Sequence, residues 1–218
     1  MNILQEREFL KFIKVLNDND VLNELVVVGS WAEYVYEQAG VLPEGFGREL
    51  ITSDVDFLIG NLRKPIPPKN LLSFVKDSGY VVVTDRFTGC NKIYTENLEI
   101  EFLIAQKGAG TKSSLKTNLG IMAQTLRHME VLVNNIETFR CLEFEVKAPS
   151  LESFVLHKMI INRERGIKAE KDAFAIMNLL PFLDKEKFNN LFETLSKTEK
   201  RKANEFMTAH EILAKRTE

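Results

Sequence analysis

The sequence predicts an α+β protein, in which a mixed β-sheet flanked by helices is followed by a helical C-terminal part. Three observations lead to this prediction. Short apolar runs alternate with amphipathic segments as far as Pro149, a hairpin pattern interrupts this alternation, and the pattern is helical from Ser150 onward. We therefore expect one domain over residues 1–149 and a helical domain over residues 150–218.

In the first part, helices and strands follow one another closely. Apolar residues at helical spacing predict a helix over residues 3–16. The run NELVVVG predicts a buried strand that ends at Gly29, with Ser30 as the N-cap of a helix that Gly40 closes. After a loop rich in Gly and Pro, we expect a strand at DVDFLI, a break at KPIPP, a helix at KNLLSFVKDSG, a strand at YVVVT and a hairpin in FTGCNKIYTENLEIEFLIA.

The segments after this hairpin are less regular. QKGAGTKSS predicts a loop, which serves either as a substrate lid or as a linker. The apolar residues of NLGIMAQTLRHMEVLVNN have mixed spacing and leave its structure open, whereas FRCLEFEVKAP predicts an edge strand stopped by Pro149. Helical segments follow, the first capped by Ser150: SLESFVLHKMIINRE, KAEKDAFAIMNLL, DKEKFNNLFETLS and EKRKANEFMTAHEILAK.

Composition and charge argue against several classes of protein. The formal net charge of −2 excludes a chain that is basic throughout, although it leaves a local basic patch open. Cys90 and Cys141 form no disulfide framework, and we expect a reducing, cytoplasmic compartment. The N-terminus lacks the pattern of a signal or transit peptide, and no apolar run approaches the roughly 20 residues that span a bilayer. We expect no membrane association.

Asp54 and Asp56 stand one residue apart within a predicted strand. Alternate residues of a strand point to the same side, which brings the two carboxylates within roughly 6–7 Å of each other. Such charges repel in a partly dry site, and Mg²⁺ removes the repulsion because it prefers carboxylate oxygens. LEIEFLI offers a third acid, and we favour Glu101 over Glu99 because Glu101 lies deeper among apolar residues. Taken alone, the pair Asp54 and Asp56 or the pair Glu99 and Glu101 is equally consistent with a strand face exposed to solvent.

Gly29 and Ser30 form the turn between a predicted strand and a predicted helix. Backbone N–H groups at a helix N-terminus suit phosphate oxygens, and glycine lets the backbone approach them closely. A phosphate site and a metal-binding pair of carboxylates together predict nucleotide chemistry, which neither feature predicts alone.

In combination, Gly29-Ser30, Asp54-x-Asp56 and Glu101 resemble the pattern of the nucleotidyltransferase superfamily, which has the polymerase-β-like fold. The string GSWAEYVYEQAG…TSDVDF is particularly similar to a bacterial subgroup of predicted nucleotidyltransferases with a helical C-terminal region. The later pattern of this subgroup matches Pro149, His157-Lys158 and Lys171-Asp172, and the resemblance spans roughly residues 25–180. The segment between Gly-Ser and the aspartates is longer here than in most of the superfamily.

The resemblance implies transfer of a nucleoside monophosphate from an NTP, such as ATP, to a hydroxyl acceptor, with two Mg²⁺ ions as cofactors. The implied catalytic and metal-binding residues are Asp54, Asp56 and Glu101, and the implied nucleotide-binding residues are Gly29, Ser30, Lys158 and Lys171. Asp172 either forms a simple helix pair or orients Lys158.

The acceptor stays open at this point. An RNA, a tRNA or a protein would be the acceptor of a toxin-like enzyme, which could also have an antitoxin partner. The alternatives are a small-molecule transferase of the antibiotic-modifying type and a non-catalytic nucleotide-binding module. Trp31 and Tyr34 either stack on a base or pack in the core. Arg86 and Lys92 face phosphate, an RNA acceptor or solvent, and the sequence does not give the oligomeric state.

Overall fold

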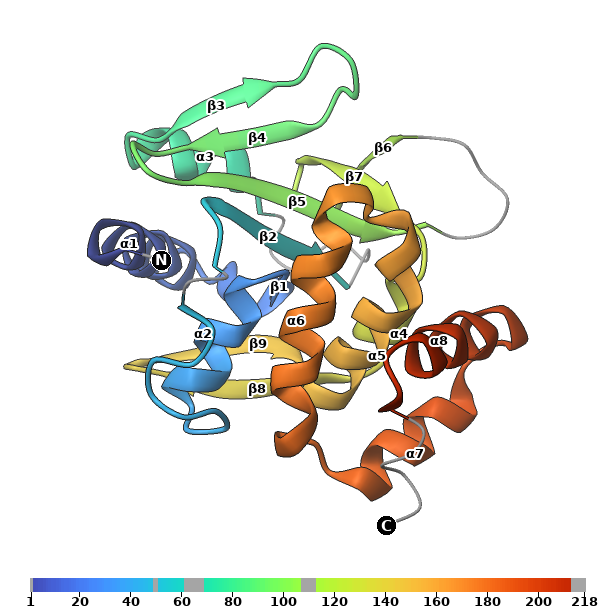
Figure 1. Cartoon of the computed structure of the whole chain (residues 1–218). Helices are drawn as coiled ribbons and strands as arrows, with labels where there is room; N and C mark the ends of the chain where they lie inside the picture. The colour runs from blue at the N-terminus through green and yellow to red at the C-terminus, as the bar shows by residue number, and fades with distance from the viewer. Residues whose placement is uncertain (1, 49–50, 61–68, 107–112, 213–218) are drawn as a thin grey trace. The chain divides into compact units, whose positions relative to one another are not determined.

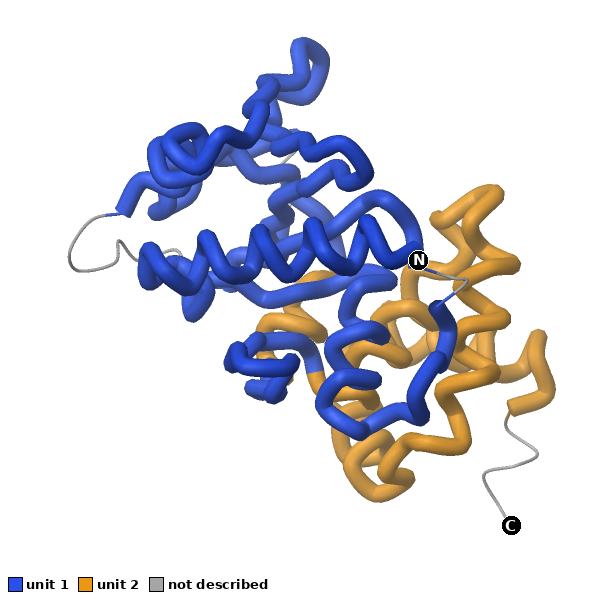
Figure 2. Tube along the Cα trace, turned by 90° about the vertical axis from the view of Figure 1, so that its left-hand side faces the viewer, with its two compact units in different colours: residues 1–127, 136–149 blue, residues 128–135, 150–218 orange. Residues whose placement is uncertain are grey.

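The computed structural model describes residues 2–48, 51–60, 69–106 and 113–212. It divides into two compact units, one of residues 1–127 and 136–149 and the other of residues 128–135 and 150–218 (Figure 2). The expected domain boundary between residues 149 and 150 stays a prediction. The KPIPP break and the KGAGTK part of the expected loop lie outside the described residues.

The described part of the first unit is built on a nine-stranded mixed sheet (Figure 1). Its strand order is β3-β4-β5-β2-β1-β9-β8, while β7 pairs with β5 and with β6. The strands are β1 (Leu25–Val28), β2 (Asp54–Ile59), β3 (Val81–Thr84), β4 (Asn91–Tyr94), β5 (Glu99–Ala105), β6 (Ser114–Lys116), β7 (Met122–Leu126), β8 (Ile136–Cys141) and β9 (Phe144–Pro149). The strands β2 and β5 pair in parallel at the middle of the sheet, and both carry predicted acids.

The described residues of this unit form three α-helices: α1 (Ile3–Asp18), α2 (Trp31–Gln38) and α3 (Leu71–Asp77). The ring of Phe12 on α1 lies 5.7 Å from that of Phe57 on β2, and the ring of Phe9 lies 4.5 Å from that of Trp31 on α2. Because neighbouring residues of a strand point to opposite faces, α1 covers the face of β2 that lies opposite to Asp56. The apolar core of the unit therefore leaves the other face of β2 to the polar side chains.

The described part of the second unit is helical: α4 (Glu130–Val133), α5 (Leu151–Ile161), α6 (Ala169–Leu179), α7 (Lys185–Thr194) and α8 (Lys197–Ala209). Every residue from Leu151 to Ile160 is buried, as expected of a helix surrounded by other helices. α5 packs against α4, α6, α7 and α8. Ser150 caps α5 as predicted, because its Oγ accepts a hydrogen bond of 3.3 Å from the Ser153 N–H.

The structure confirms the α+β class, corrects one detail of the sequence prediction and supplies another that the sequence left open. FRCLEFEVKAP is not one edge strand: β8 and β9 form a hairpin that turns at Leu142, and β9 lies inside the sheet between β1 and β8. The segment left open, residues 118–135, contains the strand β7 and the short helix α4. Within the described ranges, no helix has both the length and the apolarity that crossing a membrane requires.

Candidate active site

The turn after β1 places Gly29 against Asp56. Gly29 has φ +66°, a conformation that residues with a side chain rarely adopt. A Cβ added at this position would lie 2.5 Å from Oδ2 of Asp56, which is closer than a real contact allows. Glycine is therefore required here twice, by the backbone conformation and by the approach of the carboxylate.

Ser30 does not cap α2 in the way the sequence suggests. It precedes the helix, but its side chain makes no capping hydrogen bond. Its Oγ instead lies 3.2 Å from Oγ1 of Thr52 and accepts a hydrogen bond of 3.3 Å from the Thr52 N–H. The indole N–H of Trp31 also donates to the Thr52 carbonyl, at 3.0 Å. These contacts tie the Gly-Ser turn to the chain that enters β2.

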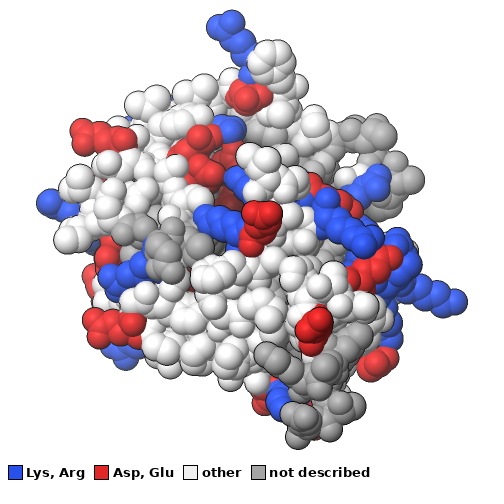
Figure 3. Space-filling view, viewed as in Figure 1, with Lys and Arg blue, Asp and Glu red and all other residues white. Residues whose placement is uncertain are grey.

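The acids of β2 and β5 lie on one face of the sheet. The parallel register pairs Asp54 with Glu99 and Asp56 with Glu101, and residues directly opposite each other point to the same side. Figure 3 shows acidic side chains gathered in the upper part of the view, where β2 and β5 lie in Figure 1. Over the rest of the surface seen in this view, acidic and basic side chains are mixed.

Lys92 on β4 binds both glutamates. Its ammonium lies 2.5 Å from Oε1 of Glu99 and 2.5 Å from Oε1 of Glu101, and about a quarter of its side chain is exposed. The hydrogen bonds to Glu101 and Glu99 raise the pKa of Lys92 above its ordinary value, so the lysine stays charged. Tyr94 also donates a hydrogen bond of 3.2 Å to Glu99. The two glutamates are thus held by β4.

The sequence prediction left the role of Lys92 open, although the sequence contains a signal for it. Four residues separate Tyr94 from Glu99, and a hairpin of this length pairs Lys92 with Glu101. A lysine directly opposite a glutamate predicts a cross-strand ion pair.

The aspartate pair lies beside the Gly29 turn. Asp54 and Asp56 supply hard oxygen ligands on one face, and the Gly29 turn receives the Asp56 carboxylate without a side chain between them. Within the part of the chain that the structure describes, no three acidic, histidine or cysteine side chains form a group that could hold a metal ion. Glu101, the expected third ligand, is bound to Lys92.

Lys158, predicted to bind nucleotide, lies in the second unit and is bound to Asp172. The distance from Lys158 Nζ to Asp172 Oδ1 is 2.9 Å, and Arg165 Nε lies 2.9 Å from Oδ2. Burial alone would raise the pKa of Asp172, but the charges of Lys158 and Arg165 lower it below its ordinary value. Asp172 therefore orients Lys158, which was one of the two alternatives. The nucleotide-binding roles of Lys158 and Lys171 stay predictions.

The aromatic residues after Ser30 belong to the core. Trp31 and Tyr34 are fully buried, and their rings pack on Phe9 of α1. Of the two alternatives left by the sequence, core packing is the one that the structure shows. Stacking on a base would need exposed rings.

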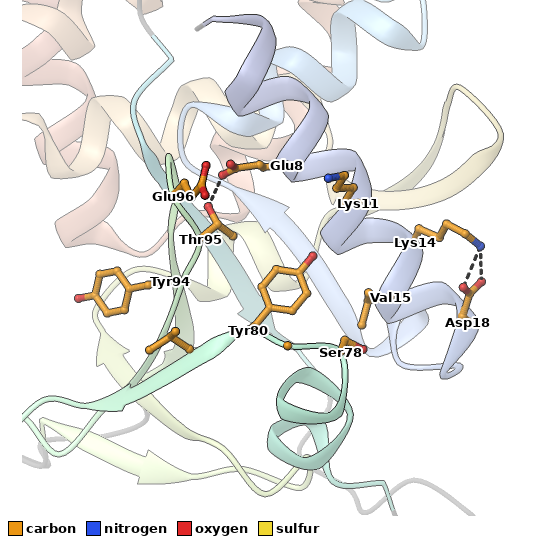
Figure 4. Close-up of a pocket in the computed structure, with 12 residues that line it drawn as sticks. Glu8, Lys11, Lys14, Val15, Asp18, Ser78, Tyr80, Tyr94, Thr95 and Glu96 are labelled. Atoms are coloured by element: carbon orange, nitrogen blue, oxygen red, sulfur yellow. Dashed lines mark hydrogen bonds and ion pairs between the residues drawn. The ribbon is translucent and has the colours of Figure 1, made fainter.

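A separate cavity of about 750 Å³ lies between α1 and the β3–β4 end of the sheet (Figure 4). Glu8 and Lys11 of α1 line it, together with Tyr80, whose ring points into it. The ring of Tyr94 points away from this cavity, in keeping with its bond to Glu99 on the other face. None of the residues predicted for the active site lines it.

The mixed sheet, the Gly-Ser turn and the paired aspartates beside it agree with the nucleotidyltransferase pattern that the sequence resembles. A family model described as "Nucleotidyltransferase" matches residues 7–200. The chain therefore belongs to the nucleotidyltransferase family, as its resemblance to the superfamily implied. No curated protein matches the sequence.

One solved structure shows the same fold at low sequence identity. An antigenic nucleotidyltransferase-like protein from Paracoccidioides brasiliensis is 15% identical, with a TM-score of 0.55, over 94% of this chain and 90% of that one. The antibiotic-resistance factor ANT(2'')-Ia is 12% identical, with a TM-score of 0.43, over 96% of each chain. A tRNA nucleotidyltransferase is 15% identical, with a TM-score of 0.26, over 89% of this chain and 59% of that one.

Proposed function

We propose that this protein transfers a nucleoside monophosphate from an NTP to a hydroxyl group of an acceptor, in a reaction that depends on Mg²⁺. The observation that carries the proposal is the fit between Gly29 and Asp56, where a side chain at residue 29 would collide with the carboxylate. A turn shaped around an acid, at the start of a helix, suits a phosphate group that shares a cation with that acid.

In this proposal, Asp54 and Asp56 would hold the cations, and Glu101, which is paired with Lys92, would be the third ligand. When bound, two Mg²⁺ ions would offset the charge of the triphosphate and of the attacking and leaving oxygens. The Gly29 N–H and Ser30 bind the β- and γ-phosphates. Lys158 and Lys171 are proposed to bind the triphosphate as well.

The transfer forms one bond and breaks one. The acceptor hydroxyl oxygen forms a bond to the α-phosphorus, and the bond from this phosphorus to the oxygen that bridges it to the β-phosphate breaks. The nucleoside monophosphate stays on the acceptor and pyrophosphate leaves with the bridging oxygen. A carboxylate oxygen of Glu101 is proposed to accept the hydroxyl proton.

We propose RNA, tRNA or protein as the acceptor, the cytoplasm as the compartment and an antitoxin as a partner of a toxin-like enzyme. The two cysteines, Cys90 and Cys141, are free and buried, which supports a reducing compartment. Copurification with the product of a neighbouring gene tests the antitoxin partner.

The proposed activity is tested by incubating the full chain with Mg²⁺ and each α-³²P-labelled NTP, alone and with total tRNA. We expect label on the tRNA or on a protein for one of the NTPs, and no label with Asp56→Asn. Label on an added small hydroxyl compound alone would favour the antibiotic-modifying alternative. NTP binding without labelling of any acceptor would favour a non-catalytic module and would contradict the proposal.

A further inference from the structure

The acidic face of the sheet continues without interruption onto the β3–β4 hairpin. Directly opposite residues run from Val83 through Lys92 and Glu101 to Asp56, one on each of four neighbouring strands. A second row runs from Val81 through Tyr94 and Glu99 to Asp54. Residues in such rows point to the same side of the sheet. The hairpin therefore extends the surface on which the acids lie.

This extension is apolar and open to solvent. Val81 and Val83 are 61% and 43% exposed, although valine is usually buried in a sheet. β3 is the last strand on this side of the sheet, so no strand of the described chain covers its outer edge. Exposed apolar side chains that continue a polar site are typical of a binding surface.

The tip of the hairpin holds an aromatic ring in solvent. Phe87 is 99% exposed, and the neighbouring Arg86 is exposed as well. The Asp85 carboxylate fixes this turn, because Oδ1 accepts hydrogen bonds from the Phe87 N–H at 2.9 Å and from the Thr88 N–H at 2.7 Å. The ring is thus presented by an ordered turn and contributes no burial to the fold.

We propose that the β3–β4 hairpin binds the single-stranded end of an RNA acceptor, with bases stacked on Phe87 and Tyr94 and packed on Val81 and Val83. This inference rests on the proposed function and names its acceptor. Aromatic side chains at intervals along an exposed surface are the usual means of binding single strands, because every base has a stacking face.

The length of the surface selects a polymer over a small molecule. Three inter-strand spacings separate Val83 from Asp56, which amounts to about 14 Å. Phe87 lies beyond Val83 at the tip. An acceptor that contacts both the hairpin and the aspartates must extend over this length, as a nucleic acid strand does and a single sugar ring does not.

The charges of the hairpin predict how this binding responds to salt. Lys92 is already paired with two glutamates, and the Asp85 charge is taken up by the turn. Arg86 is therefore the main cation that the hairpin offers to a phosphate. Stacking supplies most of the affinity, and we expect a shallow dependence on salt.

A basic surface on the second unit is the alternative place for RNA to bind. Arg163, Lys197, Lys200 and Arg201 line an open cavity of about 730 Å³ on α8 and the turn after α5, and these four cations outnumber the lining acid Glu205, which pairs with Arg163 and Arg201. RNA bound at this basic surface would depend steeply on salt and would not respond to changes in the hairpin.

The test measures binding of a fluorescein-labelled single-stranded RNA of random sequence, about twelve nucleotides long, by anisotropy without NTP or Mg²⁺. The wild type is compared with Phe87→Ala and with Phe174→Ala, whose ring on α6 is 54% exposed. We expect Phe87→Ala to weaken binding about tenfold, and Phe174→Ala to bind as the wild type does. Affinity of the wild type should fall little between about 50 and 200 mM KCl.

No binding by the wild type, equal binding by Phe87→Ala, equal losses in both variants or a steep salt dependence would each overturn the proposal. Because the measurement needs no catalysis, its failure is distinguishable from failure of the proposed function. Where transfer to RNA is observed, Phe87→Ala should raise the KM for RNA and leave the KM for NTP unchanged.

Discussion

Gly29 lies so close to Asp56 that a single methyl group on its Cα would stand 2.5 Å from Oδ2 of the carboxylate. This contact permits a matched experiment, because Gly40 has a similar φ of +74° but nothing within 4 Å of an added Cβ. Gly29→Ala and Gly40→Ala should each lose about 1–2 kcal/mol of unfolding free energy from the left-handed backbone.

Only Gly29→Ala should also displace Asp56, and we expect its nucleotide transfer to fall at least about a hundredfold, since a small displacement of a catalytic group has this effect. Chemical denaturation measures the stabilities, and the labelled-NTP assay measures the activity. Equal activities in the two variants would show that the carboxylate does not depend on the turn.

Lys92 neutralises Glu101, which the proposed function gives as a ligand of the metal. Replacing Lys92 with Met removes the ammonium that holds Glu99 and Glu101. The unpaired carboxylates should then attract a cation, and we expect Mn²⁺ to bind about tenfold more tightly in the absence of NTP. Electron paramagnetic resonance of free Mn²⁺ measures this binding without any turnover.

Lys14→Met is the control for this experiment, because Lys14 forms an exposed ion pair with Asp18 on α1. It should bind Mn²⁺ as the wild type does. If Lys92→Met also binds Mn²⁺ as the wild type does, Lys92 does not compete with a cation for Glu101.

Asp172 compensates two cations within the second unit. Asp172→Ala leaves the buried Lys158 ammonium, whose side chain is 11% exposed, without this carboxylate. We expect a loss of about 3–5 kcal/mol, the usual result of removing one partner of a buried ion pair. Lys158→Met should cost less, because Arg165 still pairs with Asp172. Urea unfolding of both variants tests this order, and a larger loss in Lys158→Met would contradict it.

His157 should make the protein sensitive to acid. It is buried, its Nε2 has no hydrogen-bond partner in the described part of the chain, and burial lowers its pKa from 6.5 to about 3. A histidine with a lowered native pKa leaves stability intact above pH 6.5, and stability falls as the pH drops toward 3. We expect a loss of about 1.4 kcal/mol per pH unit within this window.

The measurement is the urea midpoint between pH 7 and pH 4 for the wild type, His157→Leu and the exposed-site control His210→Leu. His157→Leu should reduce the slope with pH, and His210→Leu should retain it. An unchanged slope in His157→Leu would assign the acid sensitivity to other groups.

The order of the elements could be predicted from the sequence because local signals agree with the fold. Gly40 and Gly79 end helices with positive φ, and Ser150 caps α5, as their residue types indicate. The β8–β9 hairpin could not be predicted from the sequence, because it turns at Leu142 with φ +54°, where no Gly or Asn marks the turn. Tertiary pairing decides that conformation, and a local pattern does not contain it.

In the candidate site, too, some features could be predicted from local sequence and others depend on tertiary contacts. Alternation along the strands correctly placed Asp54 and Asp56 on one face, and the parallel register put Glu101 beside Asp56. The binding of Ser30 to Thr52 instead of the helix N-terminus depends on a segment 22 residues further along the chain. The residues of the turn alone therefore do not reveal that Thr52 holds the Ser30 hydroxyl.

The chain passes between the two units three times, since residues 128–135 belong with the helices while residues 136–149 return to the sheet. Ser150 N–H donates to the Asn135 carbonyl at 2.7 Å, which joins the early segment to the later helices. During synthesis, neither unit can be completed while the ribosome is still making the hairpin β8–β9. A fragment cut at residue 149 would carry α4 without the helix that buries it, so the sheet half is a poor choice for expression on its own.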